Sequence, residues 1–275
     1  MKYGFLFVNF NNTNFSKQAI ESLLSNNGEL SSPVIIVDNC SFKESVLGLK
    51  ELERRFPLVK VIYNSKNVGY FKGLNLGIKF IKENLYDIDY WVVGNNDLLF
   101  SKNFGTELAG AQQILDHYPV VSPNITTLDG VPQNPAVIRS ISKFRELIYD
   151  LNHLSFRLSR LIHWVSSITN RFTDRSDERD CNVAQEIYQG YGACYIFGPR
   201  FFEHFSELWA PSFLMYEEFF LAKQLEGIGF KTFYEPSIKV THQCKGATGA
   251  MPNKFMWERS CEGHKIYRKY VKLWS

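Results

Sequence analysis

The sequence contains few cysteines and no long apolar run. Its five cysteines are odd in number and widely scattered, and no two form a C-x-x-C pair, which argues against a disulfide framework and a zinc site. No stretch of about 18 consecutive apolar residues occurs, so no membrane-spanning helix is expected. The apolar run at residues 3–8 is too short for the core of a signal peptide. We therefore expect reduced thiols and a cytoplasmic protein.

Internal repeats, low-complexity tracts and a clear interdomain linker are also absent. The 275 residues are 45% hydrophobic and 15% aromatic, which is enough to bury a large core as one domain, with or without an appendage. The same composition argues against disorder. We therefore expect a folded chain built around one main domain.

The net charge of +3 hides two basic segments. Residues 139–175 carry seven Lys or Arg against three acids, and residues 254–275 carry six against two. Both segments are rich in apolar and aromatic residues, and the first has apolar residues at helical spacing, which favours contact with an anionic membrane surface. Ordinary amphipathic helices packed on the domain are the alternative. No nucleic-acid-binding motif accompanies either segment, so no nucleic-acid partner is expected.

Strands and helices alternate along the first hundred residues. Apolar runs at residues 3–8 and 90–94 predict buried strands, residues 34–37 and 59–63 predict two further strands, and amphipathic segments between them predict helices. Repeated units of this kind form mostly parallel sheets with helices on both faces. We therefore predict an α/β fold with a mostly parallel mixed sheet flanked by helices, a helical insertion around 139–180 and a C-terminal helical extension.

Polar residues follow several of the predicted strands. They are Asn9 after the first, Asp38 and Asn39 after the second, and Asn95, Asn96 and Asp97 after the fourth. Ligands of open α/β sheets gather at the carboxyl ends of strands, so these side chains are candidate ligand-binding groups. A plain turn is the alternative for residues 95–97, because Asn and Asp are common turn formers. His242 stands at another predicted strand end, later in the chain.

A glycine-rich loop and helix start at residues 67–77. Glycines at positions 69, 73 and 77 weaken the start of the helix by roughly 1 kcal/mol each relative to alanine, unless a close partner compensates. One such partner is an anion, and a diphosphate is one candidate. The alternative is a tight contact between helix and sheet. The spacing is not the dinucleotide pattern G-x-G-x-x-G, which argues against a Rossmann dehydrogenase.

Several short motifs occur in a fixed order along the chain. They are Val37–Ser41, Asn67–Gly77, Asn95–Asp97, Gly192–Cys194, Tyr216–Glu218, and His242 followed by Thr248. In these motifs and their order the sequence resembles the family 2 glycosyltransferases of the GT-A (Rossmann-like) fold, in particular bacterial enzymes similar to the rhamnosyltransferases of O-antigen and capsule assembly. The resemblance spans residues 3–249. It implies a GT-A domain over 1–249, including the helical insertion, and a basic, aromatic C-terminal extension over 250–275.

The resemblance implies an inverting glycosyltransferase. The sugar would move from a nucleotide-diphosphate donor, dTDP-rhamnose or a UDP-hexose, to a hydroxyl of a glycan or lipid-linked oligosaccharide acceptor in bacterial surface polysaccharide synthesis. Together with the basic segments, this implies a cytoplasmic protein with peripheral contact to the inner face of the cytoplasmic membrane.

The resemblance also implies residues for donor and metal binding. The donor would contact Asn9, Asp38, Asn39, Asn67, Gly69, Gly73, Asn75, Asn95, Asn96 and Thr248. Asp97, with His242 as an added ligand, would hold Mn²⁺ or Mg²⁺ against the donor diphosphate, and the imidazole favours Mn²⁺. Such an ion offsets the negative charge that develops on the departing nucleoside diphosphate.

Inversion needs one general base opposite the leaving group, and the resemblance places it at Glu218, with Glu217 just before it. Adjacent glutamates on a helix point about 100° apart, so one of the two faces the sugar. The usual family pattern is Glu-Asp-x-Asp, whereas this chain has Glu217-Glu218-Phe219-Phe220. The base is thus one methylene longer, and Phe220 replaces a carboxylate.

Two other functions agree with parts of the sequence. A non-catalytic GT-A module that binds a nucleotide or scaffolds an assembly is favoured by the departures at Glu218 and Phe220. A sugar nucleotidyltransferase also uses an α/β nucleotide-binding fold. It is disfavoured because Asn11–Asn14 stands where a glycine-rich, basic phosphate loop would follow the first strand.

Overall fold

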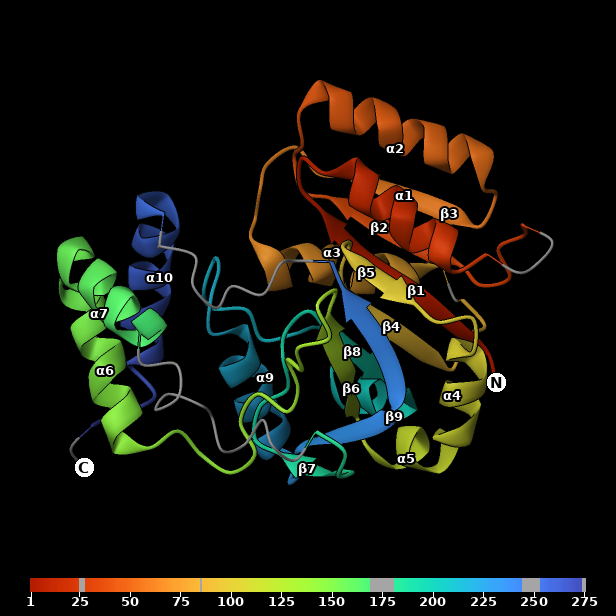
Figure 1. Cartoon of the computed structure of the whole chain (residues 1–275). Helices are drawn as coiled ribbons and strands as arrows, with labels where there is room; N and C mark the ends of the chain where they lie inside the picture. Colours follow the sequence, from red (N-terminus) through yellow and green to blue (C-terminus); the bar gives the residue numbers. More distant parts are fainter. Residues whose placement is uncertain (25–27, 85, 169–180, 244–252, 274–275) are drawn as a thin grey trace.

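The computed structural model describes residues 1–24, 28–84, 86–168, 181–243 and 253–273, which share one nine-stranded sheet (Figure 1). The strands are β1 (Tyr3–Asn9), β2 (Val34–Asp38), β3 (Val59–Tyr63), β4 (Tyr90–Asn95), β5 (Leu98–Phe100), β6 (Val120–Thr127), β7 (Gln185–Ile187), β8 (Cys194–Phe197) and β9 (Thr232–His242). Their order is β3-β2-β1-β4-β8-β6-β9-β5, and β7 pairs with β9.

The sheet is mostly parallel, as the sequence predicts. β3, β2, β1 and β4 are mutually parallel, and β6 is parallel to β9. β8 is antiparallel to both of its neighbours, and β5 and β7 are antiparallel to β9. Because the first four strands point the same way, their carboxyl ends share one edge of the sheet, where the polar residues of the sequence motifs lie.

Helices cover both faces of the sheet because successive strand side chains point to opposite faces and both sets are apolar. In β1, Phe5 and Phe7 pack on one face and Leu6 on the other. The first face is covered by α1 (Thr13–Ser22), α2 (Lys43–Arg55), α4 (Phe104–Gly110) and α5 (Gln112–His117). The second is covered by α3 (Tyr70–Glu83), α8 (Pro199–His204) and α9 (Glu217–Glu226).

Three further helices form a unit that we call the helical layer: α6 (Lys143–Leu154), α7 (Phe156–Ile168) and α10 (Lys254–Tyr267). α6 and α7 fall within the predicted insertion, and α10 falls within the predicted extension; residues 169–180, 250–252 and 274–275 of those segments lie outside the described residues. Figure 1 shows the layer at the left, beyond α9. α10 packs on α6, so the two basic segments meet in space.

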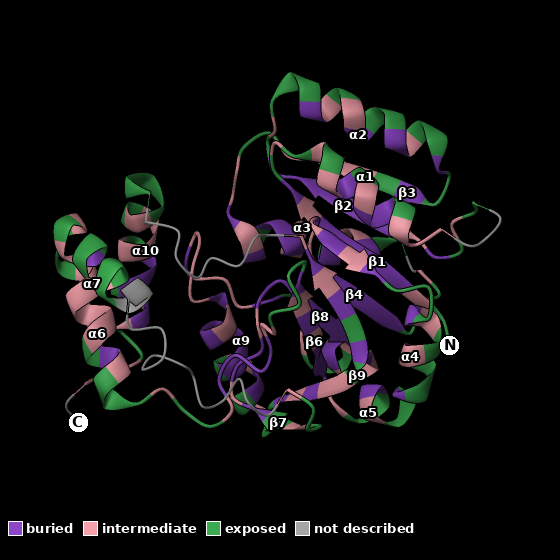
Figure 2. Cartoon of the chain, in the orientation of Figure 1, coloured by how far each residue is buried: buried purple, intermediate pink, exposed green. Residues whose placement is uncertain are grey.

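Burial differs between the sheet and the helical layer. Figure 2 shows the buried residues gathered in the strands and in the helix sides that face them, whereas α6 and α7 are mostly intermediate or exposed. None of the helices in the described part of the chain is both long and apolar enough to cross a membrane. The main core therefore lies in the sheet and its flanking helices.

Candidate active site

Asn9 is the centre of a hydrogen-bond network at the carboxyl edge of the sheet. It ends β1 and is fully buried. Its Nδ2 donates to Asp38 Oδ1 at 3.0 Å and to Ser45 Oγ at 3.2 Å, and its Oδ1 accepts from Asn96 Nδ2 at 3.0 Å. Asp38 also accepts from the Ser41 backbone at 3.1 Å. The structure thus brings Asn9, Asp38 and Asn96 together, and their polar groups hold the strand ends to one another.

A second network fixes the loop before α3. Asn39 Nδ2 donates to Asn67 Oδ1 at 2.9 Å and to the Gly69 carbonyl at 3.0 Å, and Asn39 Oδ1 accepts from the Val68 backbone at 3.0 Å. Gly69 has φ +92°, and a Cβ there would lie 1.9 Å from the Phe213 carbonyl oxygen. Position 69 therefore requires glycine, both for its backbone conformation and for its contact with the segment that leads to α9.

The other predicted residues of α3 have packing roles. A Cβ at Gly77 would lie 2.1 Å from Leu6 Cδ1, and one at Gly73 would lie 3.3 Å from Val8. Asn75 holds the loop before α9 by donating to the Leu208 carbonyl and accepting from the Leu208 backbone, both at 2.8 Å. Of the two explanations that the sequence left open, the contact between helix and sheet accounts for Gly77.

Asp97 and His242 lie side by side at the ends of paired strands. In the β5–β9 ladder Leu98 pairs with His242, and Asp97 Oδ1 lies 3.1 Å from His242 Nε2. The other ring nitrogen, Nδ1, lies 2.8 Å from Gln133 Oε1. An amide oxygen only accepts hydrogen bonds, so Nδ1 donates to Gln133 and Nε2 faces Asp97.

This pair fits a divalent cation. Asp97 Oδ1 is buried without a hydrogen-bond donor, and His242 Nε2 faces it. A histidine that donates its second ring N–H to a carbonyl oxygen is typical of metal ligands. Among the described residues, no group of three or more His, Cys, Asp or Glu is arranged to hold an ion. A cation bound by this pair would therefore need further ligands, and diphosphate oxygens are of the right chemical type for Mg²⁺ or Mn²⁺.

Glu217 and Glu218 open α9 in different surroundings. Glu217 is buried, and its Oε1 has no hydrogen-bond partner. Burial, and then the charge of Glu218, raises the pKa of Glu217 to about 8. Glu218 is half-buried, and its Oε1 accepts from the Gly192 backbone at 3.2 Å. Near neutral pH Glu217 therefore holds a proton, which leaves Glu218 as the better proton acceptor of the two.

Two residues in left-handed conformation precede these glutamates. Met215 has φ 72° and Tyr216 has φ 67°. Such conformations cost about 1–2 kcal/mol for each non-glycine residue and persist where the surrounding structure enforces them. The turn sets the direction in which α9 starts, and therefore where both carboxyl groups point.

Tyr70, at the start of α3, bonds to the same residue as Glu218 and was not singled out in the sequence. Its hydroxyl donates to the Gly192 carbonyl at 2.8 Å, and the Gly192 N–H donates to Glu218. Burial raises the pKa of Tyr70 well above the ordinary value, and the ionisable groups around it, Cys194 first, add to the effect. A tyrosine in a helical segment carries no sequence signal for such a role, and the same is true of Gln133, which lies 109 residues before His242.

The remaining predicted positions are less connected to this centre. Asn95 ends β4 half-buried, and its backbone N–H donates to the Ala193 carbonyl at 2.9 Å. Thr248 lies outside the described residues. Phe220, at the position of the missing carboxylate, is fully buried and packs edge-on against Trp209 and Tyr270. A carboxylate at that position would be buried among aromatic rings.

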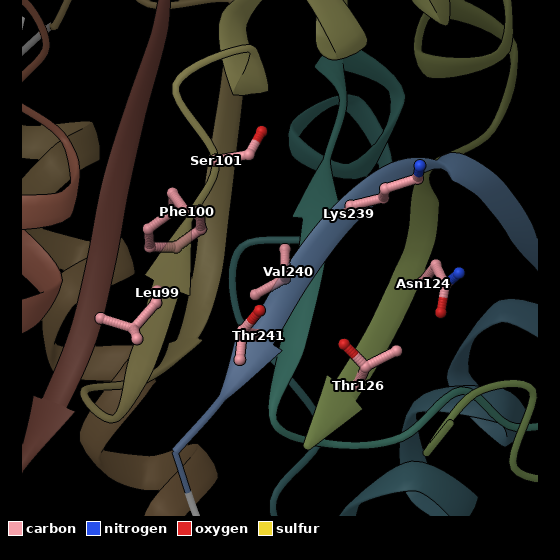
Figure 3. A pocket seen from close by; sticks show the side chains of 8 residues that line it. All are labelled: Leu99, Phe100, Ser101, Asn124, Thr126, Lys239, Val240 and Thr241. Atoms are coloured by element: carbon pink, nitrogen blue, oxygen red, sulfur yellow. The ribbon is translucent and has the colours of Figure 1, made fainter. Parts of the chain in front are cut away.

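A shallow pocket of about 450 Å³ lies on the sheet at β5, β6 and β9 (Figure 3). Leu99, Asn124 and Thr241 are among the side chains that line it. None of the predicted site residues belongs to its lining, although Thr241 directly precedes His242. The candidate site is therefore defined by side-chain chemistry at the strand ends rather than by this pocket.

Three solved structures share the fold. GalNAc-T7 with UDP, GalNAc and Mn²⁺ aligns over 91% of this chain and 45% of its own, with a TM-score of 0.55 and 13% identity. S. aureus TarS 1-349 with UDP-GlcNAc aligns over 90% and 60%, with a TM-score of 0.56 and 11% identity. The mannosyltransferase PcManGT from Pyrobaculum calidifontis with GDP-Man and Mn²⁺ aligns over 90% and 58%, with a TM-score of 0.53 and 10% identity. This chain spans less than two thirds of each of them.

No curated protein sequence matches the chain. The model of the family described as "Glycosyl transferase family 2" matches residues 6–158, which is more than half of the chain. That range includes Asn9, Asp38 and Asp97, whereas the two glutamates of α9 and His242 lie beyond it. The sheet order and the flanking helices agree with the GT-A glycosyltransferase structures. The chain therefore belongs to glycosyl transferase family 2 and has the GT-A fold.

Proposed function

We propose that the protein is a metal-dependent inverting glycosyltransferase that moves a sugar from a nucleotide diphosphate to a hydroxyl group. The observation that carries this proposal is the pair of Asp97 and His242 at the strand ends, 3.1 Å apart, in which the buried Asp97 oxygen has no hydrogen-bond donor. Membership of glycosyl transferase family 2 supports it. So do the structural relatives, which were solved with UDP, UDP-GlcNAc or GDP-Man.

Glu218 acts as the general base in this proposal. It takes the proton of the acceptor hydroxyl while the oxygen attacks the anomeric carbon, and the bond to the diphosphate breaks on the opposite side of that carbon. The electron pair of the broken bond leaves with the diphosphate oxygen, so the anomeric configuration inverts. Glu217, which holds its proton near neutral pH, does not compete for this role.

The donor would lie along the carboxyl edge of the sheet, with Asp38 near the base or ribose and the start of α3 beside the diphosphate. The networks of Asn9 and Asn39 fix the shape of this edge. Asp97 and His242 would hold Mn²⁺ or Mg²⁺, which offsets the charge of the leaving group when bound. We propose dTDP-rhamnose as the donor, with UDP-hexoses as the next candidates.

We assign the glycosyltransferase domain to residues 1–249 and a basic extension to 250–275. The acceptor would be a glycan or lipid-linked oligosaccharide of bacterial surface polysaccharide synthesis. Its lipid carrier would place the protein at the inner face of the cytoplasmic membrane, as a cytoplasmic protein in peripheral contact with the bilayer. The basic charge of residues 139–175 and 254–275 supports this location.

Replacing the proposed base tests the mechanism. We expect Glu218→Gln to reduce transfer by at least about a hundredfold, because removing a general base costs roughly 10²–10⁴-fold and the amide keeps the shape of the site. Nucleotide affinity, measured by calorimetry with UDP and Mn²⁺, should change little. Glu203→Gln, an exposed glutamate on α8, is the matched control. Full turnover by Glu218→Gln would remove the residue from this role.

A donor panel tests the reaction class. With Mn²⁺ present, we expect slow release of nucleoside diphosphate from one of several dTDP-, UDP- and GDP-sugars, and loss of that release in Asp97→Ala. Asp129→Ala, an exposed turn residue, is the control. If no donor of the panel releases nucleoside diphosphate, the result would favour a non-catalytic nucleotide-binding or scaffold protein. Unchanged turnover in excess chelator would show that no metal is required.

A further inference from the structure

The side of α6 that faces away from α10 is apolar. Phe144, Leu147 and Leu154 are 70%, 43% and 70% exposed. With Leu151 between them, these residues recur three and four positions apart, so they form one stripe along the helix. A surface helix of a globular protein ordinarily turns such a stripe toward the core.

The charged stripe of the same helix is turned inward instead. Glu146 is 6% exposed, and its Oε2 lies 2.9 Å from Arg268 Nη1. Asp150 Oδ1 accepts from Arg268 Nε and lies beside His264 Nε2, both at 2.7 Å. His153 follows on the same stripe and lies 2.8 Å from Ser260 Oγ. α6 is therefore an amphipathic helix with its polar side packed on α10 and its apolar side turned out.

This orientation also separates the charges. Glu146 and Asp150 are the acids of α6 and α7 in the sequence, and both point toward Arg268. The exposed charged side chains of these two helices are Lys143, Arg157 and Arg160. We call the outer face the exposed surface of α6 and α7, which carries these three cations and the exposed apolar residues Phe144, Leu147, Leu154 and Leu161.

We propose that the outer face binds an anionic lipid bilayer. The inference deepens the peripheral membrane contact under Proposed function and rests on it, since it names the surface that makes that contact. Exposed apolar side chains enter the boundary between headgroups and acyl chains, and cations beside them bind anionic headgroups. A second copy of the chain fits less well, because a symmetric contact would place the three cations of one copy against those of the other.

Vesicle binding of the full chain tests the proposal. We expect the protein to sediment with phosphatidylglycerol vesicles at about 50 mM salt, and less so with phosphatidylcholine vesicles or at high salt. The triple variant Phe144→Ser, Leu147→Ser, Leu154→Ser should weaken this binding at least about tenfold. Arg157→Gln with Arg160→Gln should weaken it about twenty-fivefold, since each cation near an anionic surface contributes roughly fivefold. Leu47→Ser, at a 55% exposed leucine on α2, is the matched control and should change nothing.

The outcomes test three claims separately: which surface binds the membrane, whether the protein binds a membrane at all, and whether it turns over a donor. Equal binding by the triple variant and the wild type would show that the outer face is not the binding surface, although the membrane contact itself would still be supported. No binding to phosphatidylglycerol would overturn both. Concentration-dependent dimers that the triple variant abolishes would assign the face to a second copy and overturn the lipid proposal. We expect donor turnover without vesicles to be the same in the triple variant and the wild type. A loss of turnover in the triple variant would show damage to the enzyme, which is a separate result from the loss of membrane binding.

The inner side of the helical layer carries a second, independent feature, because it contacts the turn that leads into Glu217. His264 Nδ1 lies 2.8 Å from the Tyr216 hydroxyl, and His264 Nε2 lies 2.7 Å from Asp150 Oδ1. The Tyr216 ring stacks on Tyr267 with centroids 4.6 Å apart and an angle of 19°. Since a carboxylate only accepts, Nε2 carries the proton and Nδ1 accepts from the tyrosine hydroxyl.

We infer that His264 is a positioning residue for the glutamates of α9. Tyr216 is in the left-handed conformation, and its side chain is held at the hydroxyl end by His264 and at the ring by Tyr267. This anchor stabilises the strained turn and thereby the direction in which Glu217 and Glu218 emerge. The inference rests on the proposed function for its readout, because a positioning role is measured as a loss of turnover.

A pair of variants tests this role. His264→Leu removes the acceptor for Tyr216, whereas His264→Asn keeps an oxygen near the position of Nδ1. We expect His264→Leu to lower kcat about tenfold with little change in donor KM, and His264→Asn to restore a large part of it, although both lower the melting temperature similarly. Equal kcat in the two variants, or a wild-type kcat in His264→Leu, would reduce His264 to a stability role. Activity of the wild type itself tests the proposed function separately.

Discussion

The sheet and the helical layer distribute polarity in opposite ways. In the sheet, apolar side chains fill both faces, and polar groups are confined to the strand ends, where Asn9 and Asn39 bond with their neighbours. In the helical layer the ion pairs of Arg268 lie inside, and Phe144 and Leu154 lie outside. The sheet therefore owes its stability mainly to apolar burial, whereas the layer depends on polar contacts between α6 and α10.

The two regions are therefore sensitive to different kinds of substitution. A buried apolar core loses free energy in proportion to lost contacts and to strain. A buried ion pair contributes little net free energy, yet it costs several kcal/mol when one partner is removed and the other stays buried and charged. Substitutions of the two kinds should therefore separate the regions, and the expected effects follow in order of decreasing size.

The largest effect is expected at the junction of the sheet with the α9 segment. Gly69→Ala places a Cβ 1.9 Å from the Phe213 carbonyl oxygen at φ +92°, so overpacking adds to backbone strain and the free energy of unfolding should fall by about 4 kcal/mol. Urea denaturation measures it. Gly229→Ala is the control, because Gly229 has φ +78° with open space around it, and it should cost about 1 kcal/mol. Equal costs would contradict the close contact.

The next effect is expected inside the helical layer. Arg268→Met leaves Glu146 buried without its ion-pair partner, and we expect a loss of about 3 kcal/mol, less than for a fully buried pair because Arg268 stays partly exposed. Adding Glu146→Leu should recover part of it by removing the uncompensated charge. Hydrogen exchange resolved by region measures this loss, which should appear in α6 and α10 and spare β1 and β4. A loss of protection spread evenly over the chain would contradict the claim that this ion pair stabilises the helical layer and not the sheet.

The two regions should respond to pH in opposite directions. Burial raises the pKa of Glu217 from 4.5 to about 8, so the unfolded chain ionises first and the stability around α9 falls as pH rises from 4.5 to about 8. Burial lowers the pKa of His153 from 6.5 to about 4, so the unfolded chain takes up a proton first and the layer loses stability as pH falls from 6.5 to about 4.

Protection factors at pH 5, 6.5 and 8, corrected for intrinsic exchange, measure these two trends. Glu217→Gln should flatten the alkaline loss around α9 and leave the acid loss of the layer unchanged. His153→Gln should do the reverse. The same pH dependence in both regions would mean that they unfold as one unit, and would contradict the expectation that the stabilities of the two regions depend on different groups.

The smallest effect is expected on the outer face. Phe144 is 70% exposed, so Phe144→Ser should change the free energy of unfolding by less than about 0.5 kcal/mol. Ile36→Val, at a fully buried residue of β2, should cost about 0.5–1.5 kcal/mol by the same urea measurement. A large cost at Phe144 would show that the outer face is covered in the folded protein.

Much of the fold could be predicted from local pattern. The apolar runs at 3–8 and 34–37 match β1 and β2 within one residue at each end, because a strand buried on both faces needs a continuous apolar run. The predicted strand at 59–63 matches β3, an edge strand with Lys60 exposed. The site could be predicted in part. Asp97 and His242 do lie side by side, whereas the amides of Asn9, Asn39 and Asn75 turn out to be bonded within the protein.

The contacts that could not be predicted join residues far apart in the chain. Gln133 lies 109 residues from the histidine that it orients, and Tyr216 lies 48 residues from His264. Polar side chains such as these have no periodicity, and their partners are chosen by how the elements pack. The same reason hides the shared contact of Tyr70 and Glu218 with Gly192, which lies 122 residues from Tyr70.

Local sequence alone accounts for the alternation of strands and helices, the apolar strands and the polar residues at their ends, because each depends on neighbours within one or two turns of chain. The orientation of α6 depends instead on tertiary packing. Its sequence has an apolar and a charged stripe, and either could have faced inward. Arg268, 118 residues after Asp150, satisfies the charged stripe from α10, and this long-range ion pair turns the apolar stripe outward.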